Sequence, residues 1–127
     1  MYKRQAYEIE FIRRAGEQMT GQAIPTLIVA GGGTRYRAWL QIKADVSGCR
    51  IDVSAEPEAT LLGAALAAGI GRGVYRDEAD ALAALDQRPV ESYFPDPARH
   101  TVYQSIFENG YQVFQEPLRN YYPTFKS

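Results

Sequence analysis

Three consecutive glycines, Gly31–Gly33, directly follow the short apolar run TLIVA and precede a segment with helical spacing. Glycine at such a junction permits a positive φ, lets a ligand approach the backbone, and allows a helix to pack closely on a strand. The loop would also direct backbone N–H groups, with the dipole of the following helix, toward an anion beyond the strand. On these residues alone, a plain tight turn and a phosphate or nucleotide site both remain open.

The spacing of the glycines differs from two well-known phosphate-binding patterns. It fits neither G-x-G-x-x-G nor G-x-x-x-x-G-K-[ST]. A Rossmann-like methyltransferase or dehydrogenase is still an alternative, because Glu56 follows the loop near the roughly 20-residue distance of a ribose-binding acid. The glycine spacing and the alanine-rich segment after Glu58 count against this alternative.

Hydrophobic spacing predicts an α/β chain with few strands and several helices. Strands are expected over 26–30 and 50–55, and helices over 6–19, 35–46 with Thr34 as N-cap, 58–70 starting at Pro57, 76–85 and 98–122. The first strand is apolar throughout, as in a parallel sheet buried on both faces. Residues 89–97 form a proline-rich connector, and Gly110 and Pro117 predict a bend or break late in the last helix.

Two strands are too few for a stable parallel sheet. We therefore expect the chain either to pair with strands that it lacks or to associate through a sheet edge, for example as a homodimer. The first five residues, MYKRQ, match the translated end of a common transposon sequencing adaptor. We expect residues 1–5 to be non-native and residues 6–127 to be a C-terminal piece of a longer protein.

The composition of the chain limits the kinds of partner that it could bind. The 127 residues suffice for one domain, and a net charge of −1 gives no electrostatic case for nucleic acid or an anionic membrane. The longest weakly polar run, residues 59–70, is shorter than the roughly 20 residues of a membrane span. A single cysteine, Cys49, excludes an internal disulfide, so we expect a reducing, cytoplasmic compartment.

The segment from Val29 to Tyr75, VAGGGTRYRAWLQIKADVSGCRIDVSAEPEATLLGAALAAGIGRGVY, resembles the C-terminal domain of the FGGY family of carbohydrate kinases. The glycine loop, the WLQIKADVSG helix of 39–48 and the acidic and alanine-rich block of 58–73 stand in the family's order and spacing. The resemblance extends over roughly residues 6–122. It implies part of an actin-like, ribonuclease H-like ATPase domain that is truncated at its N-terminus.

The resemblance also implies a function and a site. Such kinases transfer the γ-phosphate of ATP, with Mg²⁺, to a hydroxyl of a sugar or polyol. Gly31, Gly32 and Gly33 would lie along the nucleotide, and Tyr36 would stand near the adenine. The aspartate base, the acidic loop for Mg²⁺ and the sugar-binding domain precede the matched region, so the isolated chain is expected to be inactive. A non-enzymatic, actin-like module that binds nucleotide is the other alternative.

Other polar and aromatic residues receive structural interpretations. Asp45 is expected to have a structural or capping role, Asp52 to point outward from its strand, and Glu58 to stabilise a helix dipole. His100 is expected to be solvated, Cys49 to be half-buried packing and Trp39 to anchor its helix in the core. The tyrosines of the last helix (Tyr103, Tyr111, Tyr121 and Tyr122) are expected to mark a surface that faced a missing domain.

Overall fold

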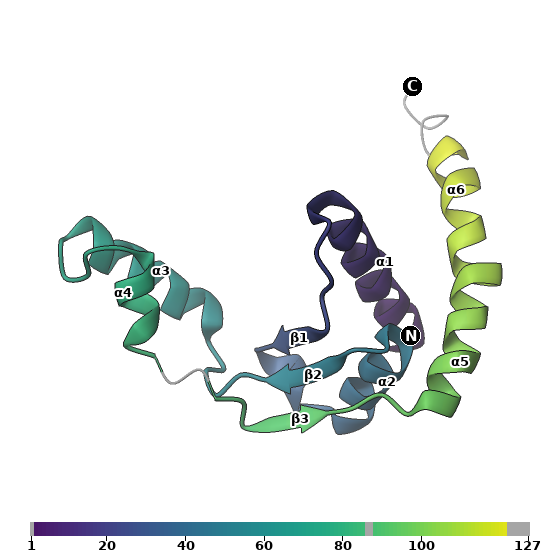
Figure 1. The fold of residues 1–127 in the computed structure, drawn as a ribbon, viewed down its shortest axis with the longest axis horizontal. Coiled ribbons are helices and arrows are strands. Elements are labelled where there is room, and N and C mark those ends of the chain that lie inside the picture. The colour runs from purple at the N-terminus through teal and green to yellow at the C-terminus, as the bar shows by residue number, and fades with distance from the viewer. Residues whose placement is uncertain (1, 86–87, 122–127) are drawn as a thin grey trace. The chain divides into compact units, whose positions relative to one another are not determined.

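The computed structural model describes residues 2–85 and 88–121, and it is an α/β chain (Figure 1). Its helices are α1 (Tyr2–Thr20), α2 (Arg37–Ser47), α3 (Ala59–Gly71), α4 (Glu78–Ala83), α5 (Pro97–Ile106) and α6 (Gln115–Tyr121). Its strands are β1 (Thr26–Val29), β2 (Arg50–Val53) and β3 (Glu91–Tyr93). Short helical turns occur at Gly32–Arg35, at Phe107–Tyr111 and at Gln112–Phe114.

The strands form one sheet in the order β1-β2-β3. The amides of Arg50 and Ser54 donate to the carbonyls of Pro25 and Val29, at a constant offset, so β1 and β2 are parallel. The amide of Val90 donates to Val53, and Ser92 Oγ donates to Asp52, so β3 runs antiparallel to β2. The parallel pair is confirmed. The connector assigned to residues 89–97 is wrong in part, because three of its residues form a strand.

The expected burial of β1 on both faces is also wrong. Ile28 is 77% exposed within the described chain. On β2, by contrast, Ile51 and Val53 are buried and alternate with half-buried residues. Asp52 therefore faces away from them, as expected. A continuous apolar sequence alone does not show which neighbouring element covers it.

The chain divides into two compact units, and each strand contributes residues to both. One unit contains residues 1–27, 38–51 and 93–127, with α1, α2, α5 and α6. The other contains residues 28–37 and 52–92, with the glycine loop, α3 and α4.

The core of the first unit lies between α1, α2 and the C-terminal helices. Ala6, Tyr7, Val46 and Phe107 are buried together there. The ring of Tyr7 lies 5.5 Å from the ring of Tyr111 and 6.3 Å from that of Tyr103, measured between centroids. The interpretation of Tyr103 and Tyr111 as a surface for a missing domain is therefore wrong, because both pack inside this unit. Tyr121 is 60% exposed, and Tyr122 lies outside the described residues.

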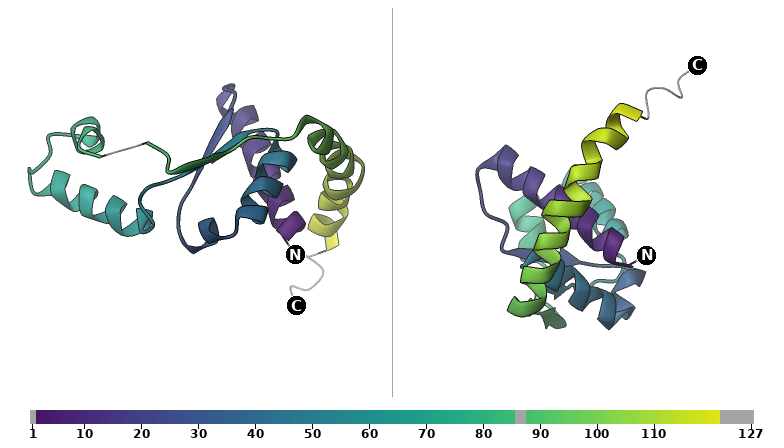
Figure 2. Two further views of the ribbon diagram at one scale, coloured as in Figure 1. Left: turned by 90° about the horizontal axis from the view of Figure 1, so that it is seen from below. Right: turned by 90° about the vertical axis from the view of Figure 1, so that its right-hand side faces the viewer.

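The C-terminal helical segment changes its hydrogen-bonding pattern partway along. Figure 2 shows α5, the two short turns and α6 following one another in a single rod. A π-helical turn at Phe107–Tyr111 contains Gly110, so the α-helical pattern changes at this glycine, but the helix does not break there. Pro117 lies in the first turn of α6, where the missing N–H removes no helical hydrogen bond.

The expected end of α1 is confirmed at Gly21, whose φ is +68°. Its amide donates to the carbonyl of Glu17. Several predicted helix starts are wrong. α1 starts at Tyr2 rather than at residue 6, and α4 starts at Glu78 rather than at residue 76. Thr34 is not an N-cap, since it lies inside the short turn that precedes α2. Pro57 precedes α3, which starts at Ala59. None of the residues of α3 is buried. One close neighbour of this helix is the ring of Tyr75, because a Cβ added at Gly69 would lie 2.9 Å from the Cδ2 atom of that ring.

Two phenols and the thiol of the first unit make its stability depend on alkaline pH. Burial raises the pKa of Tyr111 from 10.0 to about 12, and burial also raises the pKa of Tyr7 and of the Cys49 thiol. For Tyr111 the folded-state pKa is the higher one, so its contribution is complete below about pH 10 and is lost between about pH 10 and 12. Lys43 acts in the opposite sense, because burial lowers its pKa.

We expect Tyr111→Phe to reduce the loss of urea resistance between about pH 9 and about pH 11, measured by circular dichroism. Tyr36→Phe, which removes a phenol that is 58% exposed, serves as the control and should leave the loss as in the wild type. If urea resistance falls with pH in Tyr111→Phe as it does in the wild type, then the buried phenol of Tyr111 is not the cause of the loss.

Candidate functional site

The glycine loop follows β1 in the second unit and is shaped by one unusual backbone position. Gly31 has φ +86° and ψ −174°, a region that residues with a Cβ rarely enter. From Gly32 the chain turns in a short 3₁₀ segment to Arg35. The amide of Thr34 donates to the carbonyl of Gly31 over 3.1 Å, and that of Tyr36 donates to Gly33 over 3.3 Å. The first glycine is therefore required by the turn itself.

One side of this loop is open backbone. A Cβ built on Gly31 or Gly32 would meet no atom within 4 Å. In the described part of the chain, the amides of Gly32 and Gly33 donate no hydrogen bond outside their own short turn. Packing within the described chain therefore does not explain the absence of a side chain at Gly32. Close approach by another molecule would explain it.

Tyr36 ends the turn and is 58% exposed. The neighbouring Arg37 forms an ion pair with Glu91 over 3.3 Å, and the arginine side chain is 79% exposed. Gly31 and Tyr36 stand at the two ends of the turn Gly32–Arg35. All four predicted site residues, Gly31–Gly33 and Tyr36, thus lie on one short turn.

The second unit also has a cavity of about 440 Å³ beside the ends of β1 and β2. Its walls are largely apolar, and they include Ile28, Val53, Leu62, Leu82 and Pro89. Two acidic residues, Asp52 and Glu56, line it as well, and both accept hydrogen bonds within the unit. Asp52 accepts from Ser92 over 2.6 Å, and Glu56 accepts from the amide of Glu58 over 2.8 Å. Glu56 thus holds the turn that leads into α3.

Glu58 stands at the N-cap of α3 but makes no side-chain capping hydrogen bond there. Its amide is held by Glu56 instead. The carboxylate of Glu58 can therefore act on the helix only through its charge, which agrees with the interpretation of Glu58 as a dipole partner.

Asp45, predicted to be structural, lies in the first unit and is 1% exposed. Its carboxylate accepts from the amide of Asp96 over 2.9 Å and from Gln41 Nε2 over 2.8 Å, and it forms an ion pair with Arg99. These bonds connect α2 to the start of α5. The structural interpretation of Asp45 is confirmed.

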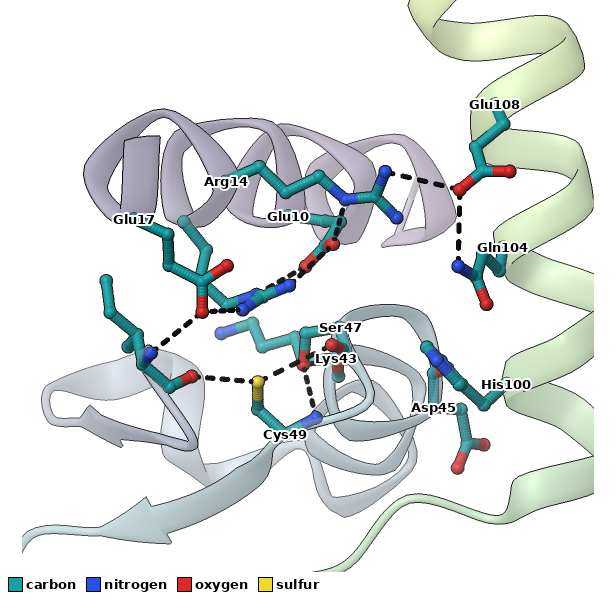
Figure 3. Close-up of polar contacts among 12 residues, drawn as sticks. Glu10, Arg14, Glu17, Lys43, Asp45, Ser47, Cys49, His100, Gln104 and Glu108 are labelled. Carbon is teal, nitrogen blue, oxygen red and sulfur yellow. Dashed lines mark hydrogen bonds and ion pairs between the residues drawn. The ribbon is translucent and has the colours of Figure 1, made fainter. Parts of the chain in front are cut away.

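The prediction that His100 is solvated is wrong. His100 Nδ1 lies 2.9 Å from the carbonyl oxygen of Asp45, and Figure 3 shows the two residues side by side. The imidazole ring also fills the space beside Gly48. A Cβ on Gly48 would lie 2.6 Å from His100 Cε1, and the φ of Gly48 is +66°. The end of α2 and the imidazole therefore pack in direct contact.

Cys49 is more buried than expected, with 5% exposure. Its Sγ lies 3.1 Å from the carbonyl oxygen of Ile24, and burial raises the pKa of its thiol. Both features disfavour the thiolate that nucleophilic chemistry requires.

Trp39 is only half-buried, with Lys43 Nζ 3.6 Å from its ring centroid. It is therefore a partial core residue.

A buried ionic network on α1 was not predicted from the sequence. Glu10 is 1% exposed and accepts from Arg13 Nε over 2.7 Å and from Arg14 Nε over 2.6 Å. Arg14 also reaches Glu108, 3.3 Å away, as Figure 3 shows. The spacings i, i+3 and i, i+4 could have suggested the pairs, but nothing in the pattern indicates that Glu10 is buried.

Metal binding and membrane insertion find no support in the described residues. No group of three or more His, Cys, Asp or Glu residues within 2–85 and 88–121 is arranged to hold a metal ion. Among the helices formed by those residues, none has the length and apolar character needed to cross a bilayer.

Comparison with known proteins identifies the family. The profile described as "FGGY family of carbohydrate kinases, C-terminal domain" matches residues 5–72, more than half of the chain. The chain therefore belongs to the FGGY family of carbohydrate kinases, and the matched part is the C-terminal domain. This assignment places it outside the Rossmann-like methyltransferases and dehydrogenases.

Individual relatives are similar over most of this chain. It is 39% identical over 93 residues to autoinducer-2 kinase of Escherichia coli K12, covering 73% of this chain and 17% of that protein. It is 36% identical over 115 residues to L-xylulose/3-keto-L-gulonate kinase of the same organism, covering 91% and 22%. The chain thus spans about a fifth of the length of these relatives.

Solved structures support the same relationship. Xylulose kinase of Rhodospirillum rubrum matches with a TM-score of 0.69 and 29% identity, over 94% of this chain and 24% of that one. Glycerol kinase of Plasmodium falciparum, solved with ADP, matches with a TM-score of 0.67 and 23% identity, over 88% and 22%. The second likeness shows the fold alone.

Proposed function

We propose that this chain supplies the nucleotide-binding side of an ATP-dependent carbohydrate kinase. In this proposal the backbone of Gly31–Gly33 lies along the nucleotide, and Tyr36 stands near the adenine. The observation that carries it is the open glycine backbone, where a Cβ on Gly32 would have free space and yet none is present. Membership of the FGGY family supports the same proposal, since that family consists of carbohydrate kinases.

The proposed reaction moves the γ-phosphoryl group of ATP to a hydroxyl oxygen of a sugar or polyol, with ADP as the leaving group. Such transfer depends on positioning and on neutralising the phosphate charge, and Mg²⁺ would supply positive charge for that neutralisation. In this chain the loop would contribute positioning, through peptide N–H groups that a close backbone brings to the phosphates. The hydroxyl-activating base and the metal ligands belong, in this proposal, to other parts of the parent protein.

The first test is whether the 127-residue chain binds nucleotide. The chain is titrated with MgADP, and binding is detected from the amide NMR signals of Gly31–Gly33. We expect these signals to shift on binding. We expect Gly32→Ala to weaken binding by about tenfold or more, because the added methyl group would occupy the space of the nucleotide. A clash of this kind costs roughly 1–3 kcal/mol.

Gly110→Ala is the matched control. A Cβ added at Gly110 would also meet no atom within 4 Å, the φ of Gly110 is not positive, and this glycine lies in the other unit. This variant should bind MgADP as the wild type does. If MgADP shifts the amide signals of other residues, and if Gly32→Ala leaves the affinity unchanged, then the glycine loop is not the nucleotide site.

The isolated chain should show no sugar-dependent turnover of ATP, because it spans only about a fifth of its relatives. A coupled assay for ADP release with a panel of sugars and polyols measures this, with a full-length carbohydrate kinase as the positive control. Turnover by the purified chain above that of a Gly32→Ala preparation would show that the chain holds the complete catalytic apparatus.

A further inference from the structure

Thr34 makes two hydrogen bonds to a single atom of the glycine loop. Its amide donates to the carbonyl oxygen of Gly31 over 3.1 Å, and its hydroxyl Oγ1 donates to the same oxygen over 2.8 Å. The threonine side chain is half-buried, so the hydroxyl contact is only partly exposed to competing water.

The accepting carbonyl belongs to the residue with the most restricted backbone of the loop. Gly31 has φ +86° and ψ −174°, and its carbonyl orientation determines the plane of the peptide that carries the amide of Gly32. Glycine by itself has great conformational freedom, so a loop of three glycines loses much entropy when it is fixed. A second hydrogen bond to this carbonyl reduces that freedom before any ligand arrives.

We propose that the Thr34 hydroxyl is a positioning group that holds the Gly31–Gly32 peptide in the orientation required for nucleotide binding. This inference rests on the proposed function of the loop and adds a specific residue to it. Thr34 need not touch the nucleotide. It acts through Gly31, and its effect on affinity arises because a preorganised loop loses less entropy on binding.

Two substitutions separate the hydroxyl from the rest of the side chain. Thr34→Val keeps the β-branched shape and the backbone N–H but removes the hydroxyl donor. Thr34→Ser keeps the donor and removes a methyl group. The hydroxyl bond corresponds to a typical net hydrogen bond, so we expect Thr34→Val to raise the Kd for MgADP by about 3- to 10-fold and Thr34→Ser to restore it to within about 2-fold.

The free protein provides a second readout. In Thr34→Val without nucleotide, the amides of Gly31–Gly33 should exchange faster with solvent and show more backbone motion, while the thermal midpoint of the chain falls by no more than about 5 °C, as expected for the loss of one hydrogen bond. A purely structural role would lower the midpoint and leave the affinity of the folded protein unchanged.

The outcomes distinguish this inference from the function on which it rests. If the wild type binds MgADP and Thr34→Val binds equally well, the positioning role is overturned and the nucleotide site stands. If Thr34→Val and Thr34→Ser weaken binding equally, the hydroxyl is not the cause and the inference fails. If the wild type does not bind MgADP, the proposed function is overturned and this inference falls with it.

Discussion

Replacing Phe107 with alanine is expected to lower the free energy of unfolding by about 3–5 kcal/mol. Phe107 is 1% exposed, and its ring lies 6.2 Å from that of Tyr7 and 5.7 Å from that of Tyr111. The guanidinium of Arg14 lies 4.6 Å from its ring centroid. Truncation would leave a cavity that these neighbours cannot close without moving. Urea denaturation followed by circular dichroism measures the loss.

Phe114→Ala is the matched control, because Phe114 ends the short turn that follows the turn of Phe107 and is 62% exposed. Its substitution should change the free energy of unfolding by less than about 1 kcal/mol. Since domains are stable by only about 5–15 kcal/mol, Phe107→Ala could leave the chain unfolded. In that case Phe107→Leu is measured instead, with an expected loss of about 1–2 kcal/mol in the free energy of unfolding. Equal losses in Phe107→Leu and Phe114→Leu would contradict the burial of Phe107.

Replacing Glu10 with glutamine is expected to cost about 3–5 kcal/mol. The carboxylate of Glu10 binds Arg13 through both oxygens, at 2.7 and 2.9 Å, and Arg14 at 2.6 Å. The Arg13 side chain is itself only 13% exposed. Glutamine keeps the shape of the side chain but leaves the two guanidinium groups without their buried counter-charge. Arg13 keeps its ion pair with Glu17, and Arg14 keeps its pair with Glu108. The cost is therefore the loss of the most buried counter-charge and of its charge-assisted hydrogen bonds.

Glu108→Gln provides the control, since Glu108 pairs with the same Arg14 from the surface. That pair is 3.3 Å long, and its side chains are 29% and 45% exposed. Solvent screens such a pair, so its loss should cost less than about 1 kcal/mol and should shrink further in salt. Comparable costs for the two substitutions would show that burial does not determine the strength of this network.

The glycine loop was the part of the site most accessible to sequence reasoning. A glycine at Gly31 follows from the turn, and the structure gives that residue a positive φ. The run TLIVA indicated a strand, and β1 pairs in parallel with β2. What the pattern could not give was the neighbourhood of each element. For that reason β1 was expected to be buried, whereas Ile28 is largely exposed.

Strand β3 and the contact of His100 with Gly48 show the same limit. Neither the ESY segment nor a lone histidine has a local periodicity that identifies its partner. Each is placed by a residue far away in the sequence, namely Asp52 for Ser92, 40 positions away, and Asp45 for His100, 55 positions away. Long-range pairing of this kind depends on tertiary packing, which local propensity does not encode.

The sequence by itself determined the local chain geometry of this protein: where helices begin and end within a few residues, where glycine is obligatory, and which family pattern the segments follow. These properties depend on backbone sterics and on apolar spacing between near neighbours. Only the tertiary structure decided that Glu10 and Asp45 are buried, that Tyr7, Tyr103 and Tyr111 share a core, and that the backbone at Gly32 is open. Burial depends on what distant segments bring to a residue, so it exists only once the chain has folded.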